Sequence, residues 1–215
     1  MALENQAPIA KEGYIFIGIG AVLTAVSFYF LTRPWTIFFG LLTLFCLWFF
    51  RDPKRKVPQG EGLLVSPADG KVVDISSVQE DRFLNKPAIK ISIFLNVFNV
   101  HINRVPAAGK IVDVSYNPGR FLAANVPKAS LENEQNAVLI ETQNGKRILC
   151  IQIAGLIARR IVCWIKKDGV LDRGERFGLI RFGSRVDLFL PPETEIQISM
   201  GDKVVGGETV LGIIR

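Results

Sequence analysis

The stretch 67-PADGKVVDIS-76 occurs again 39 residues later as 106-PAAGKIVDVS-115, with most positions unchanged. Each copy begins with a Pro-x-x-Gly turn signal and continues with alternating apolar and polar residues, which is the two-residue period of a β-strand. A repeated turn-and-strand unit predicts a duplicated β fold built from short strands. Within the turn the copies differ at one position, where Asp69 of the first copy is replaced by Ala108 in the second.

The sequence from Leu63 to the C-terminus is mostly of this kind. The strand candidates are 71–76, 89–95, 110–115, 137–142, 147–153, 186–191 and 195–200. Asn144-Gly145 predicts a two-residue hairpin turn between two of them, and only 119-GRFLAA-124 has a helical pattern. The tail 201-GDKVVGGETVLGII-214 resembles a turn of biotinyl and lipoyl carrier domains, without an evident modifiable lysine. We therefore expect residues 63–215 to form a mainly β domain, a duplicated barrel-sandwich of lipoyl-like type.

The N-terminal region is apolar. After a tail of residues 1–12, residues 13–32 carry no charge, and ~1.5 Å per residue gives a helix of about 30 Å, the thickness of a bilayer core. A second uncharged segment, 35–50, is slightly short for a full span. The pattern predicts a membrane helix, or a helical hairpin that turns at Arg33-Pro34, over residues 13–50. A secretory signal peptide fits less well, because residues 1–13 are not basic and no cleavage site follows the first segment.

Positive charge follows the apolar region. The segment 51-RDPKRK-56 opens a polar linker, residues 51–62, and by the positive-inside rule this side of the membrane is cytoplasmic. The net charge of +6 favours anionic lipid headgroups over nucleic acid, because no basic motif interleaved with aromatic residues occurs. Seven further basic residues form either a solvated face or a lipid-attracting one: Arg159, Arg160, Lys166, Lys167, Arg173, Arg176 and Arg181.

The residues available for metal binding are few. His101 is the single histidine, and the three cysteines include no Cys-x-x-Cys pair. A histidine-rich metal site is thereby excluded, and buried, reduced thiols are expected. We expect no metal.

Three residues together point to nucleophilic chemistry. Alone, His101 in its apolar context would be a packed histidine, and Asp69 would bond its own turn. Ser184 lies just before the strand that continues from Val186, and together the three supply a nucleophile, a base and an orienting carboxylate. Gly-x-Ser-x-Gly is absent, and Gly183 before the serine allows a strained backbone. The arrangement favours attack of Ser184 on its own peptide bond.

Three segments carry a family resemblance. In this order, and behind an N-terminal membrane segment, 65-VSPADGKV-72, 97-VFNVHINRVPAAG-109 and 182-FGSRVDLFLP-191 resemble phosphatidylserine decarboxylase. The sequence is more similar to the short, archaeal-type and proteobacterial branch. The resemblance extends from about residue 10 to the C-terminus.

The resemblance implies an enzyme that makes its own cofactor. Ser184 attacks the Gly183 carbonyl, and elimination leaves a pyruvoyl group at position 184, a β chain of residues 1–183 and an α chain of residues 184–215. The pyruvoyl group, without metal or pyridoxal phosphate, supports decarboxylation of phosphatidylserine to phosphatidylethanolamine at the cytoplasmic face of the cell membrane. In both stages His101 moves the proton, first as base and then as acid, and Asp69 accepts the other ring N–H.

The sequence departs from the longer bacterial members at two positions. Arg104 replaces a second histidine, and it either pairs with the substrate carboxylate or phosphate or is solvated. Arg185 replaces the threonine after the nucleophile. Two other functions stay open: a membrane serine hydrolase that uses Asp69, His101 and Ser184 without self-cleavage, and a non-enzymatic lipoyl-like membrane adaptor. The sequence also leaves open whether the chain forms a homodimer.

Overall fold

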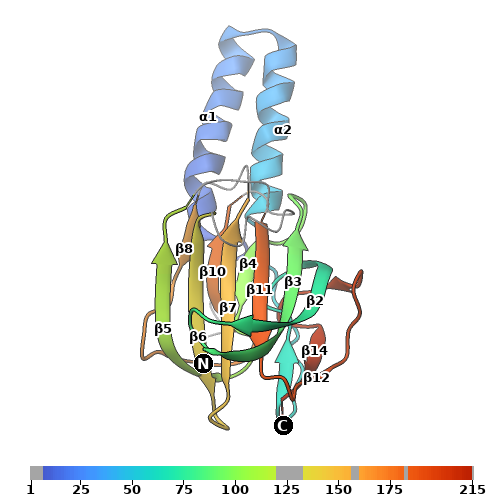
Figure 1. Ribbon diagram of the computed structural model, residues 1–215. Helices are drawn as coiled ribbons and strands as arrows, with labels where there is room; N and C mark the ends of the chain where they lie inside the picture. Colours follow the sequence, from blue (N-terminus) through green and yellow to red (C-terminus); the bar gives the residue numbers. More distant parts are fainter. Residues whose placement is uncertain (1–6, 120–132, 156–159, 182–183, 215) are drawn as a thin grey trace. The chain divides into compact units, whose positions relative to one another are not determined.

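The computed structural model describes residues 7–119, 133–155, 160–181 and 184–214. The chain divides into two compact units, residues 1–54 and residues 55–215. Helices form the first and strands form the second (Figure 1), which confirms the mainly β prediction. All but the first residue of the expected helical segment 119–124 lies outside the described residues.

The N-terminal unit contains a helical hairpin. Its elements are the 3-10 helix η1 (Lys11–Gly13), α1 (Tyr14–Phe30) and α2 (Arg33–Phe49). The chain turns at Leu31 and Thr32, just before the predicted Arg33-Pro34. Pro34 instead lies in the first turn of α2, where its missing N–H would have had no partner in the helix.

The two helices approach each other at small residues. A Cβ atom on Gly20 would lie 2.5 Å from Thr43 Oγ1, so a larger residue there would force Thr43 to move. The hydroxyls of Thr24 and Thr43 lie 3.4 Å apart, and each also donates to a carbonyl oxygen one turn back in its own helix. Large apolar side chains such as Phe28 and Phe30 are exposed on the outside. The helical segment Lys11–Phe30 is long and apolar enough to cross a membrane, and α2 is shorter.

The larger unit consists of short strands. The described strands are β1 (Leu63–Val65), β2 (Gly70–Glu80), β3 (Lys86–Leu95), β4 (Ile102–Arg104), β5 (Gly109–Asn117), β6 (Gln135–Thr142), β7 (Arg147–Ala154), β8 (Ile161–Cys163), β9 (Val170–Leu171), β10 (Arg176–Ile180), β11 (Ser184–Leu190), β12 (Glu195–Ile196), β13 (Lys203–Val204) and β14 (Val210–Ile213).

The largest sheet has a symmetric strand order. Its strands follow the order β13-β2-β3-β11-β7-β6-β5-β9, and neighbours are antiparallel. The hairpin β2–β3 corresponds to β5–β6, and the short edge strand β13 corresponds to β9, so two similar halves flank the central pair β11 and β7. Figure 1 shows β3, β11, β7, β6 and β5 side by side. Two three-stranded sheets, β1-β14-β12 and β4-β10-β8, complete the unit.

The repeated sequence forms equivalent strands. β2 begins at Gly70 and β5 at Gly109, and in both strands the register shifts between the second and fourth residues after the glycine. A Cβ atom on either glycine would collide with a backbone carbonyl oxygen of the neighbouring strand. The glycines are therefore required for close approach of the strands, and the predicted duplication is confirmed.

The main core lies on one face of the large sheet. Side chains from all three sheets contribute to it, among them Leu64, Ile93, Phe177 and Leu211. Cys150 is fully buried in this core, and burial raises the pKa of its thiol, which keeps it neutral. A smaller apolar cluster covers the other face at Ala137, Leu139, Leu149, Ile151 and Ile153. Both faces of β6 and β7 are therefore largely buried.

Two local predictions are wrong. The strand expected at 195–200 ends after Ile196, because Ser199 N donates to Asp202 Oδ2 at 2.9 Å and turns the chain. The hairpin between β6 and β7 has three loop residues, 143–145, instead of two. Thr142 N donates to the Lys146 carbonyl at 2.8 Å, and the positive φ falls on Gly145, at 73°.

Candidate active site

Ser184 is the first residue of the central strand β11. It pairs with Leu95 of β3 on one side and with Ala154 of β7 on the other. The residue is fully buried, and its Oγ has no hydrogen-bond partner in the part of the chain that the structure describes. Gly183, the other residue of the expected cleavage bond, lies outside that part. The structure thus places the expected nucleophile in a buried position where its hydroxyl has no partner among the described residues.

His101 is also fully buried and lies just before β4. Its Nδ1 is 3.0 Å from the carbonyl oxygen of Asn99. A carbonyl oxygen only accepts hydrogen bonds, so Nδ1 carries a proton and donates it. In the neutral ring, Nε2 then keeps its lone pair and is the basic nitrogen.

The topology brings His101 and Ser184 to the same end of the large sheet. β3 ends at Leu95, directly opposite Ser184, and the chain then continues through His101 into β4. β10 ends at Ile180, whose N–H donates to the His101 carbonyl at 3.3 Å, and the chain then reaches Ser184. The connections from β3 to β4 and from β10 to β11 therefore pass through this end, and each carries one of the two residues.

Asp69 lies at this end as well, but its carboxylate has other partners. Both of its oxygens are 2.9 Å from Nη2 of Arg55, and Oδ1 also accepts a hydrogen bond from Gly206 N at 2.8 Å. The carboxylate was expected to orient the His101 ring. In the structure the carbonyl of Asn99 is the acceptor at Nδ1, and Asp69 joins two turns and the linker.

Arg104 is buried, with 2% of its surface exposed, so of the two alternatives expected for it the solvated one is wrong. Its Nη1 donates to the Gly174 carbonyl at 3.0 Å, and a Cβ atom on Gly207 would lie 2.8 Å from its Cδ. These contacts hold the guanidinium against two glycine turns. Arg173 has a comparable structural role, because it donates to the carbonyls of Pro58, Gly60 and Leu63. Arg159 lies outside the described residues.

Only some of the basic side chains of the linker are exposed to solvent. Lys54 and Lys56 are exposed, whereas the Arg55 side chain is 9% exposed in its ion pair with Asp69. Two cations of the run are therefore available to a lipid surface, and a third is engaged within the β domain.

Sequence reasoning missed a row of buried amides beside the site. Asn136 Nδ2 donates to Gln152 Oε1 at 2.8 Å, and Gln152 Nε2 donates to Asn103 Oδ1 at 2.8 Å. None of the three residues is more than 2% exposed. Asn103 follows His101 by two residues, and this spacing is the signal that could have identified it.

A buried ion pair lies on the opposite face of β11. Arg185 Nε is 2.9 Å from Asp187 Oδ1, and Arg185 Nη2 donates to Asp187 Oδ2 at 3.1 Å. Since side chains alternate along a strand, these two residues point away from the face that carries Ser184 and Val186. Arg185 is therefore a structural residue, paired within its own strand.

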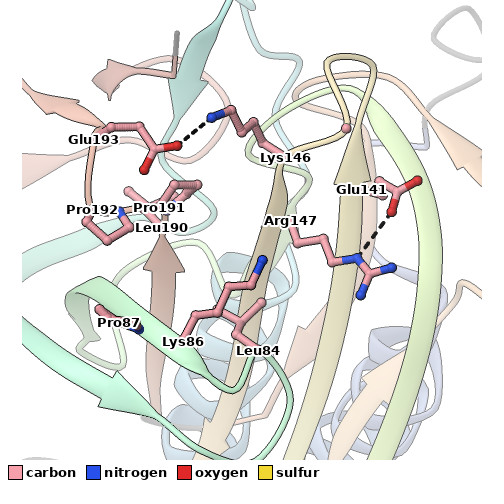
Figure 2. Close-up of a pocket in the computed structure, with 11 residues that line it drawn as sticks. Leu84, Lys86, Pro87, Glu141, Lys146, Arg147, Leu190, Pro191, Pro192 and Glu193 are labelled. Carbon is pink, nitrogen blue, oxygen red and sulfur yellow. Dashed lines mark hydrogen bonds and ion pairs between the residues drawn. The ribbon is translucent and has the colours of Figure 1, made fainter.

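A surface pocket lies at the far end of the same strand (Figure 2). It is lined by Leu190, the last residue of β11, and by charged residues that include Lys86. Lys146 pairs there with Glu193, and Arg147 pairs with Glu141. Leu190 lies six positions after Ser184 along the strand, about 20 Å at ~3.3 Å per residue. This pocket is thus remote from the candidate active site, and most of its charge is neutralised in pairs.

Known proteins are similar in sequence to this chain over nearly its whole length. The family profile for phosphatidylserine decarboxylase matches residues 42–212. A phosphatidylserine decarboxylase proenzyme of Syntrophus aciditrophicus (strain SB) is 53% identical over 211 residues, which cover 98% of this chain and 99% of that protein. Proteins of the same name from Desulfotalea psychrophila and Syntrophotalea carbinolica are each 50% identical, covering 99% and 100% of this chain and 99% and 100% of their own length. The chain belongs to the phosphatidylserine decarboxylase family.

Proposed function

We propose that the chain is the precursor of an enzyme that converts phosphatidylserine to phosphatidylethanolamine and CO₂ in membrane phospholipid synthesis. We further propose that it cleaves itself between Gly183 and Ser184 and carries a pyruvoyl group at position 184. The relatives' name, phosphatidylserine decarboxylase proenzyme, supports the reaction and the existence of a precursor. The observation that carries the proposal is the buried Ser184 hydroxyl, which has no partner among the described residues and lies at the same end of the sheet as His101.

The first step is an acyl shift from nitrogen to oxygen. Ser184 Oγ forms a bond to the Gly183 carbonyl carbon and gives its proton to Nε2 of His101. The peptide C–N bond then breaks, and the nitrogen of residue 184 takes up the proton. The product is an ester that joins the two halves of the chain. The Asn99 carbonyl keeps the proton of His101 on Nδ1, so that Nε2 is the accepting nitrogen.

The second step is an elimination. The Cα proton of residue 184 is removed and the Oγ–Cβ bond breaks, with the carboxylate of Gly183 as leaving group. Addition of water and loss of ammonia then leave a keto group at Cα. When present, the pyruvoyl group accepts the electron pair released with CO₂. The site fits this group, because Ser184 is buried and its Oγ has no hydrogen-bond partner in the described part of the chain.

We propose that His101 also supplies the proton that replaces CO₂ on the product. Asp69 is proposed as a positioning residue, since its contacts with Arg55 and Gly206 fix the turn before β2. β2 and β3 connect this turn to the site. Lys71 of β2 lies opposite Phe94 of β3, and Phe94 lies opposite Arg185, the residue after Ser184 in β11.

We propose that the hairpin of α1 and α2 is inserted in the cell membrane, with the decarboxylase domain on the cytoplasmic side. The exposed apolar side chains of the hairpin and the exposed cations Lys54 and Lys56 support this arrangement. A substrate that is itself a membrane lipid is consistent with an anchored enzyme.

The proposal is tested by intact-mass measurement and a denaturing gel of the purified protein. The wild type should give two chains, 1–183 and 184–215. The second should lack a free amino terminus and be lighter than a serine-initiated chain by the mass of ammonia. Ser184→Ala should give one uncut chain without decarboxylase activity. A wild type that stays intact and hydrolyses esters would instead favour the serine hydrolase.

A further inference from the structure

The row of amides beside the site ends in a free donor. In the chain Asn136, Gln152, Asn103, each amide donates its N–H to the oxygen of the next, at 2.8 Å in both cases. The last N–H group, on Asn103 Nδ2, is buried and has no hydrogen-bond partner among the described residues. A buried donor without a partner is destabilising, and native proteins seldom retain one.

The row is oriented so that this last donor is strengthened. Hydrogen bonds in a chain polarise one another, and here every dipole points the same way. The fold also makes room for the row, since a Cβ atom on Gly178 would lie 2.8 Å from Gln152 Nε2. Gly178 is the direct partner of Asn103 in the pairing of β10 with β4. These features indicate that the pairing of β10 with β4 fixes the position of Asn103.

The free N–H group lies beside the expected catalytic residues. Asn103 lies in β4, and His101 lies two residues earlier, where the N–H of Ile180 at the end of the paired strand β10 donates to its carbonyl; with the alternation of a strand, the two side chains project to the same side. Gln152 is opposite Val186 on β11, and Ser184 follows diagonally on the same face, about 7–8 Å away in such a pair. On this face the Ser184 Oγ is likewise buried and without a hydrogen-bond partner among the described residues.

We propose that Asn103 is a further catalytic residue of self-cleavage, and that its Nδ2–H donates to the oxyanion of the acyl shift. This inference rests on the proposed self-cleavage. When Ser184 Oγ adds to the preceding carbonyl carbon, the electron pair of the C=O bond moves to the carbonyl oxygen, and the hydroxyl proton moves to His101. A negatively charged oxygen then forms in a buried site, where a fixed, polarised donor stabilises it most.

Two variants separate this role from a structural one. Asn103→Asp keeps the shape and the acceptor for Gln152 but removes the donor. Gln152→Glu keeps Asn103, yet a carboxylate cannot donate to Asn103 Oδ1 and instead attracts the Asn103 N–H group, which is then no longer free. Ser92→Ala is the matched control. It removes another buried, unpartnered polar atom, and it lies opposite Asp187, on the other face of the sheet.

The experiment follows self-cleavage of newly translated full-length chains in detergent, by gel and intact mass, over time. Only chains that resist added protease are scored, so that the rate is that of folded molecules. Loss of one oxyanion donor is expected to slow cleavage by about 10²–10³-fold in Asn103→Asp. Gln152→Glu should slow it in the same direction, and Ser92→Ala should cleave like the wild type.

Hydroxylamine identifies the step that is slowed, because it cuts esters and leaves amides intact. If Asn103 acts in the acyl shift, the uncut variant is still an amide and resists hydroxylamine. Accumulation of a hydroxylamine-sensitive ester would overturn the proposal and place Asn103 in the elimination. Wild-type rates in Asn103→Asp or in Gln152→Glu would overturn it as well. A wild type that never cleaves would refute self-cleavage itself, which is a different result.

Discussion

Nη2 of Arg55 lies 2.9 Å from each carboxylate oxygen of Asp69, and this ion pair connects the basic linker to the turn before β2. The Arg55 side chain is 9% exposed and that of Asp69 is 14% exposed. Each charged group is therefore stabilised mainly by the other and only slightly by water. The Asp69 carboxylate is engaged in this ion pair.

Removal of either charge should destabilise the β domain. Asp69→Ala leaves a mostly buried guanidinium without its partner, and breaking such a pair typically costs about 3 kcal/mol. Arg55→Ala should cost a similar amount, and the double variant less than the sum, measured as the free energy of unfolding in urea. In a Ser184→Ala background every chain is uncut, so the comparison is not affected by cleavage. Additive effects would show that the pair contributes little.

Arg55→Ala, compared with Asp69→Asn, also defines the role of Asp69 in cleavage. If Asp69 acts by fixing the turn, Asp69→Asn and Arg55→Ala should slow self-cleavage to a similar extent. A much larger loss in Asp69→Asn, with normal cleavage in Arg55→Ala, would instead indicate that the carboxylate acts on His101 directly.

His101→Ala should block self-cleavage, because Nε2 is the proton acceptor for Ser184. The second proposed role of His101, as the proton donor in decarboxylation, is measured in a protein that does not need to cleave itself. A synthetic 184–215 peptide that already carries the pyruvoyl group is refolded with a 1–183 chain, with or without His101→Ala. Product release should be slower with the variant by about 10²–10⁴-fold, the usual contribution of a general acid. Equal rates would assign the second proton transfer to water or another residue.

Gly70 and Gly109 provide a matched pair of tests. Alanine at Gly70 collides with the Phe94 carbonyl, and alanine at Gly109 with the Glu141 carbonyl. Both variants should lose about 1–3 kcal/mol of stability, the usual effect of overpacking. Only Gly70→Ala displaces the end of β3, where Leu95 lies opposite Ser184. Cleavage should therefore slow in Gly70→Ala and stay normal in Gly109→Ala, and equal rates would show that the register near Leu95 tolerates the shift.

The hairpin of α1 and α2 should keep the protein in membranes during a wash at high salt. Surface charge attraction is screened within about 10 Å at 0.1 M salt, whereas burial of apolar surface is not. Detergent should release the protein, and sedimentation followed by a gel detects it. Release by salt alone would mean that Lys54, Lys56 and similar cations hold it at the surface.

Periodicity predicted most of the fold because the relevant interactions are local. The two Pro-x-x-Gly stretches define β2 and β5, and Asn144-Gly145 marks a hairpin even though the loop has three residues. The strand expected at 195–200 failed for a local reason too. Its apolar residues alternate, but the backbone groups from Gln197 on bond to Leu211 and to a turn at Ser199.

The site was harder to predict, because its contacts join distant segments. Gln152 alternates with Ile151 and Ile153, which suggests a solvent-facing position, but both faces of β7 are buried. Only the tertiary structure shows that Asn103 and Asn136 form hydrogen bonds with the side-chain amide of Gln152. Arg55 was expected at a lipid surface, and its partner Asp69 could not be identified from spacing alone.

The strands that follow Ser184 are distributed through the whole β domain. β11 lies between β3 and β7, β13 pairs with β2, and β14 pairs with β1. A cut before Ser184 therefore leaves the short chain held at three places, without a covalent bond. Folding of the precursor is a first-order process, whereas the cut protein would have to reassemble from two molecules. The mature enzyme would then refold in a concentration-dependent way, and its lifetime would be set by how slowly it unfolds.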